Sequence, residues 1–184
     1  MLKWLAKRAD ASRKAENLYG AVVAQAREPA FYVDFGINDT LEGRYELIVL
    51  HMFLVLEKLR EAFPGDTRWS RILIERFVTD MDDCMRELGV GDMTVPKRVK
   101  GAAAGLYGRA QRYREASGLG QDALAVALSE FICAEPTSEF RAQELAAYVL
   151  EAARVLKEID PEDMLAGILK LPDPNGFVER KELS

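Results

Sequence analysis

The run LIVLHMFLVL, residues 47–56, decides the fold class because every position in it except His51 is apolar. Such a run is too short to span a bilayer, and it predicts a helix that is covered on most sides. Asp39 and Glu42 precede the run in the spacing of a capping box, which favours a helix beginning at Asp39. We therefore expect a central apolar helix over about residues 39–63.

Apolar residues recur at helical spacing along nearly the whole chain, and no strand-like alternation persists. Beyond Leu171, two prolines and a glycine exclude an α-helix and predict an extended, flexible tail. The sequence thus predicts an all-α, single-domain bundle of about six to seven helices over residues 1–170, with a tail over 171–184. The other helices are expected at about 2–26, 67–88, 96–118, 121–133, 138–158 and 161–169.

The composition is that of a folded, acidic protein, with 49% hydrophobic residues, 30% charged residues and a formal net charge of −5. The net negative charge of the whole protein does not attract the negatively charged backbone of nucleic acid, so we expect no DNA partner. The single histidine, His51, excludes a multi-histidine metal site and fits a hydrogen-bonded core residue. Cys84 and Cys133 are far apart and fit two reduced thiols, which favours a cytoplasmic protein.

The N-terminal segment leaves a membrane contact open, although neither a transmembrane helix nor a secretory signal is recognisable. Lys3, Lys7 and Arg8 flank Trp4, a composition that suits the surface of an anionic membrane. Asp10 dilutes this charge, and the segment lacks a broad face of bulky apolar residues. We expect an ordinary surface helix, with peripheral contact at the inner face of the membrane as an alternative.

No catalytic motif is present, because no serine lies in a GxSxG setting and no glycine-rich phosphate loop occurs. Asp80, Asp83 and Glu87 share one helix face, as carboxylates do in the Mg²⁺–diphosphate sites of isoprenoid synthases. However, Arg86 lies one turn from Asp82, so ion pairing explains these charges, and no second aspartate-rich helix exists. We predict that the protein is not an enzyme and that it has no catalytic residue, metal or cofactor.

The basic segment 96–117 is the most informative for function. On a helical wheel, the face opposite its apolar side carries basic residues together with Gly101, Gly105 and Gly108. Glycine costs about 1 kcal/mol relative to alanine in a helix, so three on one face indicate close approach by another helix. The approaching helix belongs either to a partner protein or to the same domain. A third interpretation of this face is that its basic residues bind the phosphates of RNA. The basic residues of the segment are Lys97, Arg98, Lys100, Arg109, Arg112 and Arg114.

We predict that this face and the loop before it form a partner-binding surface. The rival prediction is a helical RNA- or ribosome-binding module that uses the basic helix 96–117. The residues of the predicted surface are Lys97, Arg98, Gly101, Gly105, Gly108, Arg109, Arg112, Gly91 and Asp92.

Two stretches carry longer motifs. Residues 31–51 read FYVDFGINDTLEGRYELIVLH, and residues 80–109 contain DMDDCMRELGVGD and PKRVK and end in LYGR. Together they resemble the ubiquinol–cytochrome c chaperone family of α-proteobacteria and mitochondria, over roughly residues 15–160. The resemblance implies a bacterial, non-catalytic helical chaperone for assembly of ubiquinol–cytochrome c reductase. It also implies a client protein, newly made cytochrome b or another reductase subunit, and leaves contact with the ribosome open.

The resemblance also marks individual positions, without separating those that touch a client from those that support the fold. Besides residues of the predicted surface, the family pattern falls on Asp39, Gly43, Arg44, His51, Arg86, Glu87, Gly89 and Tyr107.

Overall fold

The computed structural model describes residues 2–133 and 140–178. Within these ranges every regular secondary-structure element is a helix, as the periodicity predicts. Six helices have 12 residues or more, and α2 and α8 are short helices of 5 residues each. None of the described helices is both long and apolar enough to cross a bilayer. The elements are α1 (Leu2–Ala26), α2 (Pro29–Val33), α3 (Leu41–Ala62), α4 (Arg68–Glu87), α5 (Val95–Leu119), α6 (Gln121–Ile132), α7 (Ala142–Glu158), α8 (Pro161–Leu165) and the 3-10 turn η1 (Pro174–Phe177).

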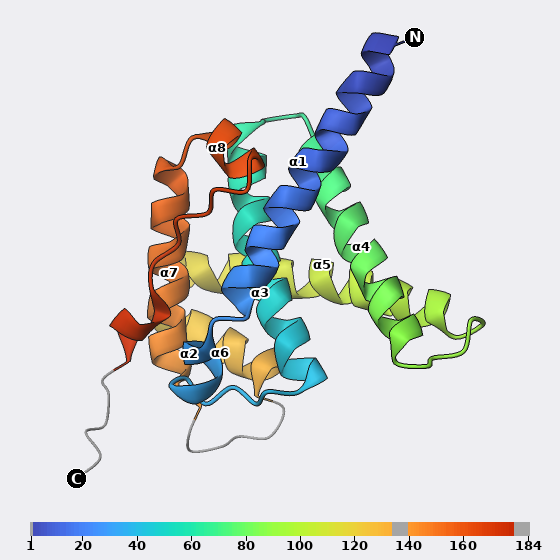
Figure 1. The fold of residues 1–184 in the computed structure, drawn as a ribbon. Helices are drawn as coiled ribbons and strands as arrows, with labels where there is room; N and C mark the ends of the chain where they lie inside the picture. The colour runs from blue at the N-terminus through green and yellow to red at the C-terminus, as the bar shows by residue number, and fades with distance from the viewer. Residues whose placement is uncertain (1, 134–139, 179–184) are drawn as a thin grey trace.

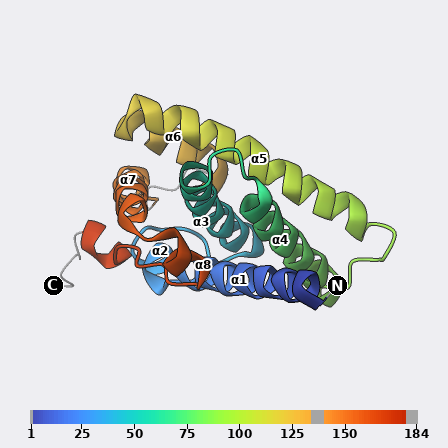
Figure 2. The same cartoon turned by 90° about the horizontal axis from the view of Figure 1, so that it is seen from above.

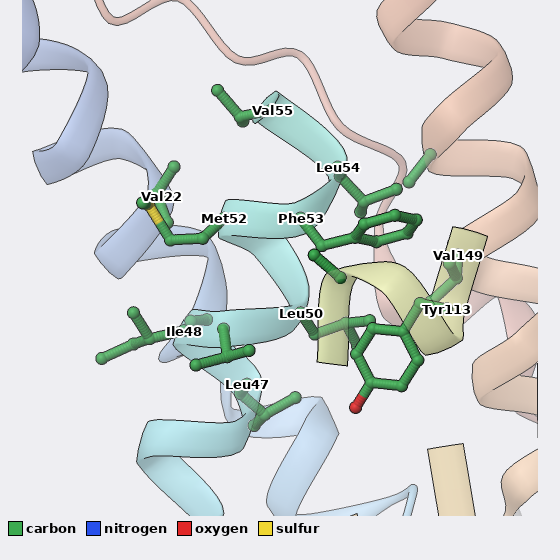
Figure 3. Close-up of a cluster of buried hydrophobic side chains, with 14 of the residues drawn as sticks. Val22, Leu47, Ile48, Leu50, Met52, Phe53, Leu54, Val55, Tyr113 and Val149 are labelled. Atoms are coloured by element: carbon green, nitrogen blue, oxygen red, sulfur yellow. The ribbon is translucent and has the colours of Figure 1, made fainter. Parts of the chain in front are cut away.

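Helix α3 is the centre of the bundle, which confirms the prediction drawn from its apolar run. Every residue from Glu46 to Val55 is buried. Helix α3 lies between α1 on one side and α5 and α6 on the other, while α7 covers a further face (Figure 1, Figure 2). Its side chains point to both sides, Met52 toward α1 and Phe53 toward the ring of Tyr113 on α5, 5.6 Å away (Figure 3). A helix surrounded in this way needs apolar residues all round.

The N-terminus of α3 lies one residue later than the capping-box pattern predicts. Thr40 is the cap, because its Oγ1 accepts a hydrogen bond from the backbone N–H of Gly43 at 3.1 Å. Asp39 instead forms an ion pair with Arg44, with 2.6 Å between Oδ1 and Nε. A threonine hydroxyl serves the free N–H groups of the first turn, and this leaves the aspartate to hold the arginine beside it.

Helices α4 and α5 form a hairpin whose connecting loop reaches beyond the rest of the bundle (Figure 1, Figure 2). Helix α4 ends at Glu87, and just beyond it Gly89 adopts a φ of +74° while the N–H of Val90 bonds back to the carbonyl of Met85 at 3.0 Å. Helix α5 begins with buried Val95 and then runs along α4 before it reaches α3 and α6. The hairpin therefore has an outer end with few neighbours and an inner end that is packed.

The prediction of an extended, flexible tail is wrong for residues 171–178, the part of the tail that the structure describes. Residues 174–177 form the turn η1 on α7, with Pro174 and Val178 buried and the ring of Phe177 edge-on to Tyr148 at 5.6 Å. The prolines exclude an α-helix but not a 3-10 turn, and Asp173 caps this turn by accepting a bond from the N–H of Asn175. Residues 179–184 of the predicted tail lie outside the described residues.

Two other segments depart from the predicted helix boundaries. Helix α2 forms between the expected helices 2–26 and 39–63, where no helix was predicted. Pro29 can begin a helix, and the aromatic ring of Phe31 is buried beneath it. The segment expected over 161–169 is helical only to Leu165, because Gly167 adopts a φ of +90° just after it.

Candidate partner-binding surface

The arginines in the inner half of α5, residues 105–119, form ion pairs with other parts of this protein. This is contrary to the prediction that Arg109 and Arg112 face a partner. Arg109 donates two hydrogen bonds to the carboxylate of Glu46 on α3, at 2.6 and 2.5 Å. Its guanidinium also stacks on the rings of Phe131, at 4.7 Å, and Tyr45, at 5.4 Å. Glu46 is only 6% exposed. Arg109 is thus a packing residue of the α3–α5–α6 contact.

Burial raises the pKa of the Glu46 carboxyl, and the hydrogen bonds from Arg109 oppose that rise. The pKa of Arg109 stays above its usual range, since these bonds outweigh the cost of burying the guanidinium. Arg112 pairs with Glu130 of α6 at 2.6 Å, and Arg114 pairs with Glu57 of α3 at 2.6 Å. All three arginines of the inner half are therefore already engaged by carboxylates of this chain.

The predicted glycine face divides in the same way. A Cβ placed on Gly105 would lie 2.8 Å from the hydroxyl of Tyr45 and 2.9 Å from the guanidinium of Arg109. Gly105 therefore leaves room for contacts within the domain, contrary to its predicted place on the partner-binding surface. A Cβ on Gly101 or Gly108 would meet nothing within 4 Å, so these two glycines do face open space.

The outer half of α5 carries cations that the structure leaves without an ion pair among the described residues. Lys97, Arg98 and Lys100 are all exposed, and none lies within 4 Å of a carboxylate there. Beside them, at the tip of the hairpin, Met93 is 97% exposed and Leu88 is 55% exposed. An unpaired basic helix end next to exposed apolar side chains is the feature of this surface that most suits a partner.

A groove of about 640 Å³ runs along α4 and reaches Tyr107 of α5, and it was not foreseen from the sequence. Ile74 and Val78 of α4 line it, and the ring of Tyr107, 59% exposed, stands at its α5 side. The signal in the sequence was the spacing of Ile74 and Val78 at i and i+4, which by itself is equally typical of core packing.

The loop of the hairpin is held by Arg86, whose guanidinium contacts the carboxylates of both Asp82 and Asp92. This confirms the ion pair of Arg86 with Asp82, whereas Arg86 does not pair with Asp83. Asp80 has another partner, accepting a hydrogen bond from the hydroxyl of buried Tyr19 at 2.8 Å. Over the described ranges, no three acidic, histidine or cysteine side chains are arranged to hold a metal ion. Gly91 and Asp92 therefore lie on the exposed tip, with Asp92 tied to Arg86.

Comparison with known proteins identifies the family of the chain. The model of the family described as "Ubiquinol-cytochrome C chaperone" matches residues 33–171, which is most of the chain. The chain belongs to the ubiquinol–cytochrome c chaperone family. It is therefore an assembly chaperone of ubiquinol–cytochrome c reductase, respiratory complex III.

A solved structure agrees with this placement. The crystal structure of the Cbp3 homolog from Brucella abortus is similar to this chaperone, with 35% sequence identity and a TM-score of 0.81. The alignment covers 97% of this chain and 100% of that chain. No curated protein matches.

Several of the family-pattern positions have structural roles in this chaperone. A Cβ on Gly43 would lie 2.1 Å from the backbone oxygen of Asn38, so only glycine fits where the chain enters α3. Asp39 and Arg44 pair across that entry, and Gly89 ends α4. Among the other positions, Glu87 and Tyr107 are exposed and have room for a partner.

His51 is a fully buried core residue of the chaperone. Its Nδ1 lies 2.7 Å from the carbonyl of Leu47, which can only accept, so Nδ1 carries the proton. Nε2 then accepts the hydroxyl hydrogen of Tyr148 at 2.9 Å, and the Tyr148 oxygen accepts from the amide of Gln25 at 3.1 Å. Every ring nitrogen is satisfied by a neutral imidazole, and burial lowers the pKa of His51 from 6.5 to about 4.

This shift predicts that acid destabilises the chaperone through His51. Between pH 6.5 and about 4, the unfolded chain binds a proton at His51 that the folded chain does not. The free energy of unfolding should therefore fall as the pH falls through that window, by up to about 3 kcal/mol. Urea denaturation of the wild type and of His51→Gln from pH 7 to pH 4.5 measures this loss. Wild type and variant with the same pH dependence would contradict it.

Proposed function

We propose that this chaperone binds newly made cytochrome b through the exposed outer half of α5, and that it acts by binding alone, without catalysing a reaction. The observation that supports the surface is the contrast within α5. Its inner arginines are paired with carboxylates of the same chain, whereas Lys97, Arg98 and Lys100 are exposed and have no ion pair among the described residues. Unpaired charge beside apolar surface gives a partner both attraction and orientation.

The proposed surface keeps part of the predicted set and assigns the rest to supporting it. Gly105, Arg109 and Arg112 hold α5 on α3 and α6, and this fixes the direction in which the outer half projects. The residues proposed to touch the client are Lys97, Arg98, Gly101, Gly108, Gly91 and Asp92, with Tyr107 beside them.

The pairing within α5 also bears on the RNA alternative. Each phosphate contact contributes to affinity and makes binding salt-dependent, so a helix needs several free cations to hold RNA. Arg109, Arg112 and Arg114 each give their charge to a carboxylate of this chain. This leaves fewer cations for a nucleic-acid backbone than the sequence suggests, and it favours a protein partner.

The place of action follows from the proposed client. Cytochrome b is a membrane protein, so we propose that the chaperone works from the cytoplasm at the inner face of the membrane. Contact with the membrane or the ribosome would then come through the client.

The test is capture of tagged chaperone from cells, with quantification of cytochrome b in the eluate. The double variant Lys97→Glu/Arg98→Glu should recover about tenfold less cytochrome b, because it reverses the charge that orients the client. Lys170→Glu is the matched control, since Lys170 is an exposed lysine on another part of the surface. Absence of cytochrome b from the wild-type eluate, or recovery of RNA that falls steeply with added salt, would contradict the proposal.

A further inference from the structure

The groove between α4 and α5 has the form of a seat for one helix. Its α4 side is a row at helical spacing formed by Thr67, Arg71, Ile74 and Val78. The two apolar residues of this row are only partly buried, so their side chains are available at the floor of the groove. Arg71 is balanced by Glu75, 3.8 Å away, and the α4 row therefore adds little net charge.

On α5, the residue that lines the groove is Tyr107. Tyr107 belongs to a second row on one face of α5, which Lys100 and Ala104 continue toward the hairpin loop and Gln111 continues toward the bundle. All four residues of this row are exposed. A row on α4 that faces the ring of Tyr107 across a depression matches the way in which a third helix packs its own ridge against a helix pair.

The charge along this second row is uneven. The ring of Tyr107 stands beside the apolar floor, and Lys100 lies seven residues away, about 10 Å along the helix. Lys97 is one further turn along, and neither lysine has an ion pair among the described residues. An occupant that lies in the groove and extends along α5 toward the hairpin loop would meet apolar surface first and these two lysines about two to three turns further on.

From this arrangement we infer that the groove seats one α-helix of the client, apolar where it covers Ile74, Val78 and Tyr107, with a carboxylate opposite Lys97 and Lys100. The inference rests on the proposed function for the existence of a client, and it adds the class of segment that the chaperone recognises. Apolar burial supplies attraction, and the carboxylate sets which way the helix lies in the groove.

Two synthetic helical peptides of leucine and alanine test this, one with two glutamates near one end and one with glutamines there. Fluorescence anisotropy with the full chain should show about tenfold tighter binding of the glutamate peptide at low salt. The double variant Lys97→Ala/Lys100→Ala should bind both peptides equally. Tyr107→Ala should weaken both by a similar factor, because it removes apolar wall and leaves the charge.

Leu119→Ala and Val126→Ala are the matched controls. Both positions are exposed, and both lie outside the two rows and outside the residues proposed to touch the client, so neither change should alter the preference for glutamate. Equal binding of the two peptides to the wild-type chain, or failure of both to bind, would overturn the inference. So would a single-stranded RNA oligonucleotide that displaces the peptides at physiological salt.

The two proposals can fail separately. Recovery of cytochrome b from cells without binding of either peptide would leave the client in place and remove the groove as its seat. Binding that discriminates between the peptides, without recovery of cytochrome b, would keep the groove and remove the client assignment.

Discussion

Replacing Gly43 with alanine should destabilise the chaperone by about 3 kcal/mol or more, the largest effect we expect from a single added methyl group. The new Cβ would lie 2.1 Å from the backbone oxygen of Asn38 and 3.3 Å from its carbon. A backbone carbonyl cannot swing aside as a long side chain can. The loop that ends in the Thr40 cap must therefore move, with loss of the hydrogen bond between Thr40 and residue 43. Urea denaturation followed by circular dichroism measures the change.

Gly101→Ala is the control for this experiment. It makes the same substitution within a helix, at a position where a Cβ meets nothing within 4 Å. Alanine should there stabilise the protein by about 0.5–1 kcal/mol, since glycine is the more flexible residue in the unfolded chain. If both variants shift stability by the same small amount, then the entry to α3 does not depend on glycine and our account of position 43 is wrong.

Arg109→Ala should cost about 3–5 kcal/mol, because it leaves the carboxylate of Glu46 buried without its partner. The cost comes from the unpaired charge and from the lost stacking on Phe131 and Tyr45, so a large fall in stability is expected at neutral pH. Differential scanning calorimetry and urea denaturation at pH 7 both report it.

Arg112→Ala provides the comparison on the same helix. Its pair with Glu130 is also close, but both side chains are about a third or more exposed, at 34% and 41%. Water and salt screen such a pair, so the loss should be far smaller than that of Arg109→Ala. Equal losses in the two variants would show that burial of the Glu46–Arg109 pair has no energetic consequence.

The sequence predicted the helices more reliably than it predicted their neighbours. The apolar run of α3 could only be satisfied inside a bundle. The ends of α3 and α4 lie within one residue of the predicted positions 63 and 88, because Pro64 and Gly89 follow them. Local patterns were misleading at Asp39, where two residues could cap the same helix and the hydroxyl of Thr40 was used. They also failed after Leu171, because proline excludes an α-helix but says nothing about docking.

The candidate surface was only half predictable for a similar reason. A helical wheel gives the direction in which a side chain points, but it does not show which side chains of another helix will contact it. Tyr45 and Glu46 come from α3, more than fifty residues away in sequence, and they cover Gly105 and Arg109. Nothing local distinguished those residues from Gly101 and Arg98, so the basic face looked continuous until α3 and α6 were placed beside it.

The chain of hydrogen bonds through Tyr148 has a consequence for biosynthesis. One hydroxyl joins Gln25 of α1 to His51 of α3, at sequence separations of 123 and 97 residues. A nascent polypeptide leaving the ribosome cannot complete this connection until Tyr148, in the first half of α7, has emerged. Contacts between such distant parts of a sequence slow folding, so α1 and α3 must wait for α7 before their central polar groups are paired. The chaperone should therefore become competent only after α7 has been synthesised.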